Sequence, residues 1–161
     1  MPANHPEFPL NMHFSIEFAN PKFEADQTFL SVDGLSAELT PGLAPKNIFR
    51  PNANRRTVLR PQFKQLILKR AYRPDSKLLE WCMDAINNHK REEENLTIKL
   101  LNSQHIMTSA WRIEKAIPMA WTLSELNAAE SAVLIETIVL KYAFFQVVNS
   151  KGKVVAPKID S

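Results

Sequence analysis

The sequence predicts a single α+β domain that is mainly β: a small antiparallel sandwich or barrel covered by one helix at about residues 76–88. Several segments alternate apolar and polar side chains with the period of a strand, and only one repeats apolar residues at helical spacing. A length of 161 residues can bury one core without metals or disulfides. We expect the domain at residues 1–148, beginning with a proline-rich extended arm at 1–11, and a loose tail at 149–161.

The first half of the chain contains three strand-like segments. Apolar and polar residues alternate through residues 12–18. A second strand is expected from about residue 28 to 39, with a turn or bulge at Asp33-Gly34. A third strand-like run occupies residues 63–70. These segments supply the first part of the predicted sheet.

The helix has a recognisable start. Asp75 or Ser76 can cap its free amides, directly after Pro74. Apolar residues then recur at spacings of three and four: Leu78, Leu79, Cys82, Met83 and Ile86. Such a stripe is typical of a helix packed against a sheet.

The last third of the chain is predicted to be β. Residues 96–100 alternate, and Asn102-Ser103 provides a tight turn before a return strand that Pro118 stops or bulges. Residues 119–123 read as a short extended piece. The run 131–148 is rich in β-branched residues and predicts one long strand, apolar on both faces and with edges free to pair with a neighbour.

Residues 40–61 form a Pro-rich basic excursion, in which four prolines leave room for at most a short hairpin. Nine basic residues and no acidic residue lie between residues 39 and 74: Lys46, Arg50, Arg55, Arg56, Arg60, Lys64, Lys69, Arg70 and Arg73. An acid-enriched stretch follows: Asp75, Glu80, Asp84, Glu92, Glu93 and Glu94. This polarity suits nucleic acid on the basic face or head-to-tail contact between copies, and a solvated loop is the plain alternative.

No catalytic constellation is found in the sequence. The four histidines are far apart and Cys82 has no CxxC partner, so we expect no metal, no cofactor and no enzymatic activity. Phosphate-binding and nucleophile-elbow motifs are lacking. No signal peptide or membrane-spanning run is expected, which predicts synthesis in the cytoplasm and no membrane insertion.

Several segments, taken in order, resemble the tail tube protein family of contractile phages and related injection systems. Residues 68–71 (LKRA) resemble its LKRG motif, and residues 79–81 (LEW) in the helix resemble its LW-W-like signature. Residues 96–101 (LTIKLL) are similar to its V-I-LLD strand.

The resemblance continues to residue 147. Trp111, residues 116–118 (AIP) and Trp121 match a W…A-P-W segment. Residues 126–128 (LNA) and 135–138 (IETI) resemble its L-A…IET-L segment. In all, the likeness covers roughly residues 55–147.

Some positions depart from the family pattern. Ala71 stands where the family usually has glycine, residues 102–105 lack the usual Asp and Gly of the hairpin turn, and the region before Pro61 is poor in glycine. The resemblance therefore leaves two roles open: the repeating tube subunit and the tube-initiating ring at the baseplate.

The resemblance implies a homo-hexamer whose strands join into a β-barrel ring around a lumen, with rings stacking into the inner tube of a phage-tail-like contractile injection system. The implied partners are adjacent tube rings, sheath and baseplate or spike proteins, and cargo in the lumen. Particles of this kind are cytoplasmic, membrane-anchored or released.

The resemblance and the charge pattern together suggest two sets of residues. The candidates for contacts between subunits or rings are Arg50, Arg55, Arg56, Arg60, Glu92 and Glu93. Thr97, Lys99 and Thr137 lie on the more polar faces of their strands and are candidates for lining the lumen. The alternative function is a nucleic-acid-binding β domain that uses the basic segment 46–73.

Overall fold

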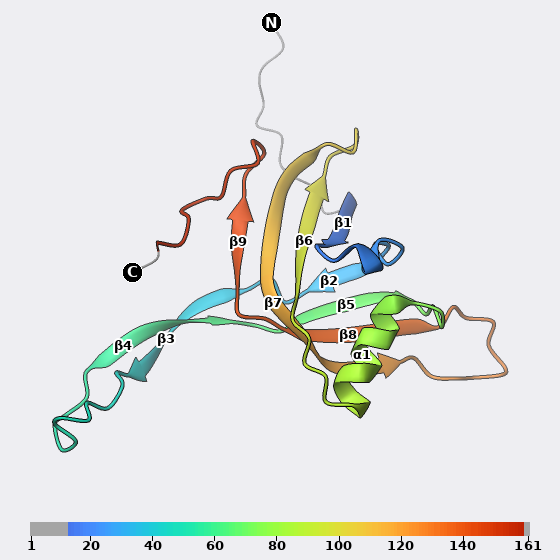
Figure 1. Ribbon diagram of the computed structural model, residues 1–161. Helices are drawn as coiled ribbons and strands as arrows, with labels where there is room; N and C mark the ends of the chain where they lie inside the picture. Colours follow the sequence, from blue (N-terminus) through green and yellow to red (C-terminus); the bar gives the residue numbers. More distant parts are fainter. Residues whose placement is uncertain (1–12, 160–161) are drawn as a thin grey trace, which may run out of the picture.

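A computed structural model describes residues 13–159, so the expected arm at residues 1–11 lies outside the described part. This part contains one α-helix, a short 3-10 helix and nine strands (Figure 1). Their bounds are β1 His13–Phe18, η1 Pro21–Phe23, β2 Ser31–Asp33, β3 Ala37–Leu43, β4 Thr57–Phe63, β5 Leu66–Ala71, α1 Lys77–Asn87, β6 Glu94–Leu101, β7 Met107–Leu123, β8 Ile135–Lys141 and β9 Phe144–Val148. The predicted α+β, mainly β class is confirmed.

Strand β7 is the common element of the main sheet. The strands run in the order β1-β6-β7-β8-β5-β2, and β9 also pairs with β7. The first half of β7 pairs with β6 and β9, and its second half, from Ile117 to Leu123, pairs with β8. All of these pairings are antiparallel. One strand therefore takes part in two differently oriented parts of the sheet, as Figure 1 shows.

Two residues of β7 mark its departures from a regular strand. Lys115 has a φ of 58°, in the left-handed region. Farther on, the register shifts between Pro118 and Ala120, so the predicted bulge at Pro118 is confirmed. The expectation of a separate piece at residues 119–123 is wrong, because β7 continues through the bulge to Leu123.

The long strand predicted at residues 131–148 is instead two strands, β8 and β9. The strand is interrupted at Tyr142-Ala143, opposite Lys115. There the Ala143 amide donates to the Glu114 carbonyl at 2.9 Å. Both strands run along β7 and change direction where it does. Because β8 is paired on both sides, it has no free edge, and its side chains alternate between buried and half-buried.

The core lies among the two parts of the sheet and α1. Ile16 and Ile98 come from one part, Leu68 and Ile138 from the other, and all are almost fully buried. Helix α1 adds three buried side chains: Leu78, Trp81 and Cys82. This packing explains why the sequence shows one helical stripe among many alternating segments.

The predicted helix at about residues 76–88 is confirmed. Ser76 is the N-cap, and its hydroxyl accepts hydrogen bonds from the amides of Leu78 and Leu79. Asn88 is the C-cap. Trp81 packs against Phe18 and Phe23, with ring centroids 6.1 and 5.7 Å away. The helix is thus fixed at its start by a cap and in its middle by aromatic packing.

The Pro-rich excursion is more ordered than a loop with a short hairpin. Strands β3 and β4 pair over seven residue pairs into a ribbon that projects from the body, with a tip at residues 44–56 (Figure 1). At its base, Phe63 packs on Tyr142 and Phe145, with centroids 5.9 and 5.1 Å away. The ribbon is joined to the core at this end only.

The tail predicted as loose from Asn149 folds back on β9 as far as Val155. Val154 bridges to Val148, and the Val155 amide donates to the Val147 carbonyl at 2.8 Å. The Asn149 side chain accepts from two amides of the intervening turn. This turn covers part of the outer edge of β9.

Gly34 provides a test of the backbone geometry that connects β2 to β3. Its φ is +96°, and a Cβ built there would lie 2.0 Å from the Gln65 carbonyl oxygen. We expect Gly34→Ala to destabilise the fold by roughly 1–3 kcal/mol or more, from strain and the backbone clash together. Urea unfolding measures this change.

Gly152→Ala is the matched control, because Gly152 also has a positive φ, of +77°, but open space around it. It should cost about 1 kcal/mol or less. Equal losses in the two variants would show that the close approach at Gln65 does not matter.

Candidate assembly surfaces

The hairpin β3–β4 has one apolar and one polar side. The register places Ala37, Leu39, Pro41, Leu43, Leu59, Pro61 and Phe63 on the same side of the ribbon, with Thr57 opposite Leu43 as the one polar member. We call Leu39, Pro41, Leu43, Leu59 and Pro61 the apolar face. Its three leucines are 53–64% exposed, although leucine is usually buried.

The other side of the hairpin is polar. It carries Glu38, Thr40, Arg60 and Gln62 together with Gly42 and Val58, and the Thr40 hydroxyl donates to the Gln62 side-chain oxygen at 2.9 Å. Arg60 also donates to the Leu43 carbonyl at 3.3 Å. A ribbon with this pattern is built to cover apolar surface on one side and face water on the other.

The hairpin tip combines cations with large apolar side chains. Arg50, Arg55 and Arg56 are all exposed there. Ile48 and Phe49, which sequence reasoning did not single out, are 83% and 85% exposed. Among the described residues, no carboxylate forms an ion pair with these arginines. Their charge is therefore available to a partner.

Glu92 and Glu93 lie elsewhere, between α1 and β6, and both are exposed. Glu92 is 3.6 Å from Lys22, which also lies 3.7 Å from the buried carboxylate of Glu94. The structure therefore does not bring these two acidic candidates together with the arginines of the same chain.

The three lumen candidates are divided between two parts of the sheet. Thr97 and Lys99 lie on β6, and Lys99 pairs with Glu17 of β1 at 2.7 Å. Thr137 lies on β8, between Lys69 of β5 and Thr122 of β7. All three are half-buried on the side of the sheet away from the core. Whether they line a lumen stays a prediction.

Arg70 was counted with the basic segment 46–73, but the structure removes it from the basic surface. Its side chain is only 1% exposed, so it cannot contact nucleic acid. The alternation of β5 places Arg70 on the inward side of the strand, the same side as Leu68. The charge pattern alone could not distinguish this inward arginine from its exposed neighbours Lys69 and Arg73.

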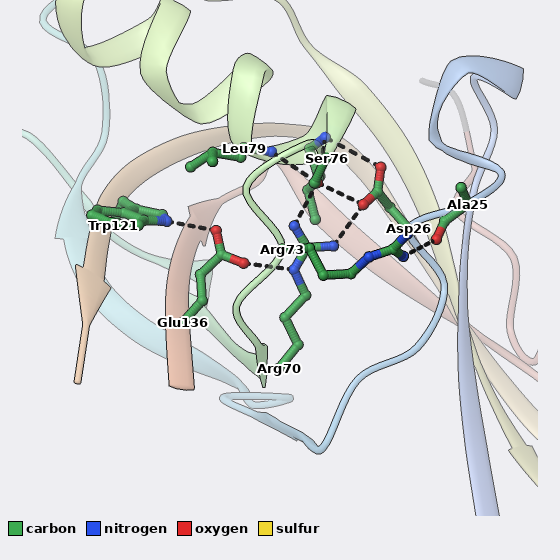
Figure 2. Close-up of polar contacts among 9 residues, drawn as sticks. Ala25, Asp26, Arg70, Arg73, Ser76, Leu79, Trp121 and Glu136 are labelled. Atoms are coloured by element: carbon green, nitrogen blue, oxygen red, sulfur yellow. Dashed lines mark hydrogen bonds and ion pairs between the residues drawn. The ribbon is translucent and has the colours of Figure 1, made fainter. Parts of the chain in front are cut away.

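Figure 2 shows the buried polar cluster around Arg70. Its guanidinium donates to Glu136 at 2.7 Å, to Asp26 at 2.7 Å and to the Ser76 hydroxyl at 2.6 Å. The Ser76 hydroxyl donates to Asp26 at 2.6 Å, and Trp121 donates to the second oxygen of Glu136, also at 2.6 Å. One cation thereby joins the segment after η1, the helix cap and three strands.

The cluster favours the charged form of Asp26. Burial alone would raise the pKa of Asp26, but hydrogen bonds from Ser76 and Arg70, and the Arg70 charge, outweigh burial and lower it. Ser76 also caps α1, so its hydroxyl is fully engaged. Its role is structural, and no general base is poised to activate it.

Cys82 is equally inert. It is fully buried, and burial raises the pKa of its thiol to about 12. Residues 13–159 contain no group of three His, Cys, Asp or Glu side chains that could hold a metal ion. Within the same range, no helix is long and apolar enough to cross a membrane.

The comparison with protein families identifies the kind of protein that carries these surfaces. Residues 10–146 match the family described as T4-like virus tail tube protein gp19. The chain belongs to this family. The match confirms the resemblance seen at residues 55–147 and extends it through the hairpin to β1. A search of the curated proteins found no match.

Solved structures share the fold of this tail tube family chain. A chain of the six-fold symmetrised anti-feeding prophage baseplate is 21% identical, with a TM-score of 0.68, and the match covers 90% of this chain and 99% of that one. A chain of the sheath–tube complex of the extracellular contractile injection system PVC is 17% identical, with a TM-score of 0.67 and coverage of 91% and 94%. A chain of the anti-feeding prophage tube-terminating cap is 18% identical, with a TM-score of 0.67 and coverage of 89% and 93%. At these identities the likeness shows the fold alone.

The tail tube family match makes this chain a structural subunit of the tail-tube type. The nucleic-acid-binding alternative gains no support from these comparisons, and buried Arg70 is removed from its surface. The last two residues of β9 and the tail that follows them lie beyond the family match.

Removing the central cation of the cluster should be costly. Arg70→Met leaves Asp26 and Glu136 buried without their partner, and breaking a buried pair in this way costs about 3–5 kcal/mol. Chemical denaturation measures the loss. Lys69→Met, on the exposed side of the same strand, should change stability by about 0.5 kcal/mol or less, and an equally small effect of Arg70→Met would contradict a structural role for the cluster.

The lowered pKa of Asp26 predicts loss of stability in acid. Because its folded pKa lies below the unfolded value of about 3.9, its contribution is complete above that value and is lost as pH falls through the folded pKa. The stability advantage of the wild type over Asp26→Asn should therefore be largest above pH about 5 and shrink below about 4. Urea titrations from pH 3 to 7 test this, with exposed Asp75→Asn as the control; an advantage independent of pH would argue against it.

Proposed function

We propose that this subunit assembles with further copies into six-membered rings of a phage-tail-like contractile injection system, as the inner tube or as the ring that initiates it at the baseplate. Family membership and the shared fold support the tail-tube role. The proposed partners are adjacent rings, sheath and baseplate or spike proteins, and cargo in the lumen. The chain would be made in the cytoplasm and function within the assembled particle.

The observation that best supports assembly is the unsupported hairpin. A two-stranded ribbon is marginally stable alone in water, and this one exposes its apolar face along its whole length. Contiguous exposed apolar surface in a soluble protein usually marks an interaction site. Arg50, Arg55, Arg56 and Arg60 on this ribbon are our proposed contact residues, with Glu92 and Glu93 as a separate acidic contact.

Ring closure would also cover open sheet edges. Strands β1 and β2 lie at the two ends of the main sheet, each with one paired neighbour. Unpaired edges invite pairing with another chain, and a closed ring removes them. Pairing with a neighbouring copy would therefore use the end strands β1 and β2. It would not use β8, which lies between β7 and β5.

The solved relatives support both roles of the ring. They come from a baseplate, a sheath–tube complex and a terminating cap, with nearly equal TM-scores. The proposal therefore includes the repeating tube and the initiating ring. Thr97 with Lys99, or Thr137, would face the lumen, since the two sets lie on different parts of the sheet.

Assembly should depend on the apolar face. The wild-type chain at high concentration should form six-fold rings or tubes, seen by negative-stain microscopy and by size-exclusion chromatography with light scattering. Leu59→Asp should raise the concentration needed for assembly by about ten- to a hundredfold. Burial of a leucine contributes about 1.5–3 kcal/mol, and each 1.4 kcal/mol of binding free energy corresponds to about a factor of ten in affinity.

The melting temperature of the dilute monomer should not change in Leu59→Asp, since this side chain is already 62% exposed. Ile106→Asp, at the β6–β7 turn, is the matched exposed control and should assemble normally. A wild-type chain that remains monomeric at every concentration, also with a baseplate partner present, would refute the proposed function.

A further inference from the structure

The loop between β7 and β8, residues 124–134, is an acidic and apolar surface. Glu125 and Glu130 are exposed, and the loop contains no basic residue. Leu126 and Val133 are 73% and 70% exposed. Residues 131–134 of this loop were expected to belong to the long strand at 131–148, but β8 begins only at Ile135.

This loop is held in a defined shape. At its base, the amide of Ser124 donates to the Ile135 carbonyl, and the Ile135 amide donates to the Ser124 hydroxyl, both at 2.9 Å. Within it, the Asn127 side chain accepts from the Ala129 amide at 3.0 Å, and the Glu130 amide donates to the Asn127 carbonyl at 3.2 Å. Its exposed side chains are therefore presented on an ordered backbone.

The loop complements the hairpin in charge and polarity. The hairpin, residues 37–63, carries Lys46 and four arginines against the single acid Glu38, and it exposes its apolar face. The loop carries only negative charge beside its two exposed aliphatic side chains. Opposite charge combined with shared apolar exposure favours a specific protein–protein contact.

The two surfaces lie on opposite sides of the subunit. Figure 1 shows the hairpin extending from one side of the body and the loop after β7 extending from the other. One chain therefore cannot bring them together, and the complement must come from another copy. A head-to-tail contact of this kind generates a ring or a stack.

Other exposed surfaces fit the hairpin less well. Glu92 and Glu93 follow Lys90 and Arg91, and Glu92 already faces Lys22. The apolar side chains of Ile86 and Met119 share a groove with Arg91 and Lys141, whose charge would repel the basic tip. The loop at residues 124–134 has neither disadvantage.

We propose that the hairpin of one copy docks onto loop 124–134 of a second copy, with the apolar face on Leu126 and Val133 and the basic tip near Glu125 and Glu130. This inference rests on the proposed assembly of the chain with copies of itself. It adds to that assembly the surface that receives the hairpin.

Cysteine cross-linking between full-length chains tests the contact directly. One preparation carries Leu59→Cys and a second carries Leu126→Cys; they are mixed at a concentration where the wild type assembles and are then oxidised. Native Cys82 should not react, because it is buried and its thiol pKa is about 12. The control mixture pairs Leu59→Cys with Glu93→Cys, because Glu93 is also exposed.

We expect a disulfide-linked heterodimer from the 59–126 mixture and little from the 59–93 mixture. A 59–93 product in its place would overturn the choice of loop. Absence of the 59–126 product in rings or tubes that form normally would overturn the inference and leave the proposed function intact. A wild-type chain that never assembles would refute the proposed function itself.

Charge reversal provides a second readout that needs no oxidation. Arg55→Glu with Arg56→Glu, or Glu125→Lys with Glu130→Lys, should each raise the assembly concentration by about tenfold. A chain carrying all four changes should regain much of the loss. If the hairpin variant assembles less readily and the loop changes do not restore its assembly, the basic tip docks elsewhere.

Discussion

The buried guanidinium of Arg70 joins segments that are far apart in the sequence. It bonds Asp26, Ser76 and Glu136, which belong to the segment after η1, the helix cap and β8. A buried ion pair adds little net stability compared with a well-packed apolar core, but the loss of one partner is strongly destabilising. Its effect is therefore to disfavour arrangements of the helix and strands that would separate Arg70 from these partners.

Local signals in the sequence were sufficient for the helix and for the fold class, and long-range pairing was not visible in them. The helix could be predicted because its cap, Ser76, and its apolar stripe are local. The interruption between β8 and β9 at Tyr142-Ala143 could not be predicted. It arises because both strands follow the change of direction in β7 near Lys115. The burial of Arg70 could not be predicted either. Alternation along β5 indicates which side of the sheet Arg70 faces, but not that carboxylates from distant segments pair with it.

The assembly surfaces show the same division between local and non-local information. The prolines and arginines of residues 40–61 marked an interaction segment, but its apolar face appears only when Leu39 and Leu59 are brought to the same side by the register of β3 and β4. Pro41 and Pro61 can belong to this ribbon because neither strand is inside a larger sheet, and proline is tolerated at sheet edges. The same prolines that argued against a strand thus fit an isolated, projecting ribbon.

In the proposed assembly, stability and assembly would be linked through this ribbon. Phe63 ties its base to Tyr142 and Phe145, next to the break between β8 and β9, while the remaining length has no support from the body of the subunit. A neighbour that covers the apolar face would order the ribbon and bury its leucines in one step, so each added copy would be stabilised by the copy before it. Isolated subunits would keep a folded core through the Arg70 cluster and leave the ribbon weakly supported. A core that folds by itself and a ribbon that is completed by a neighbour would suit a subunit that must remain folded before assembly.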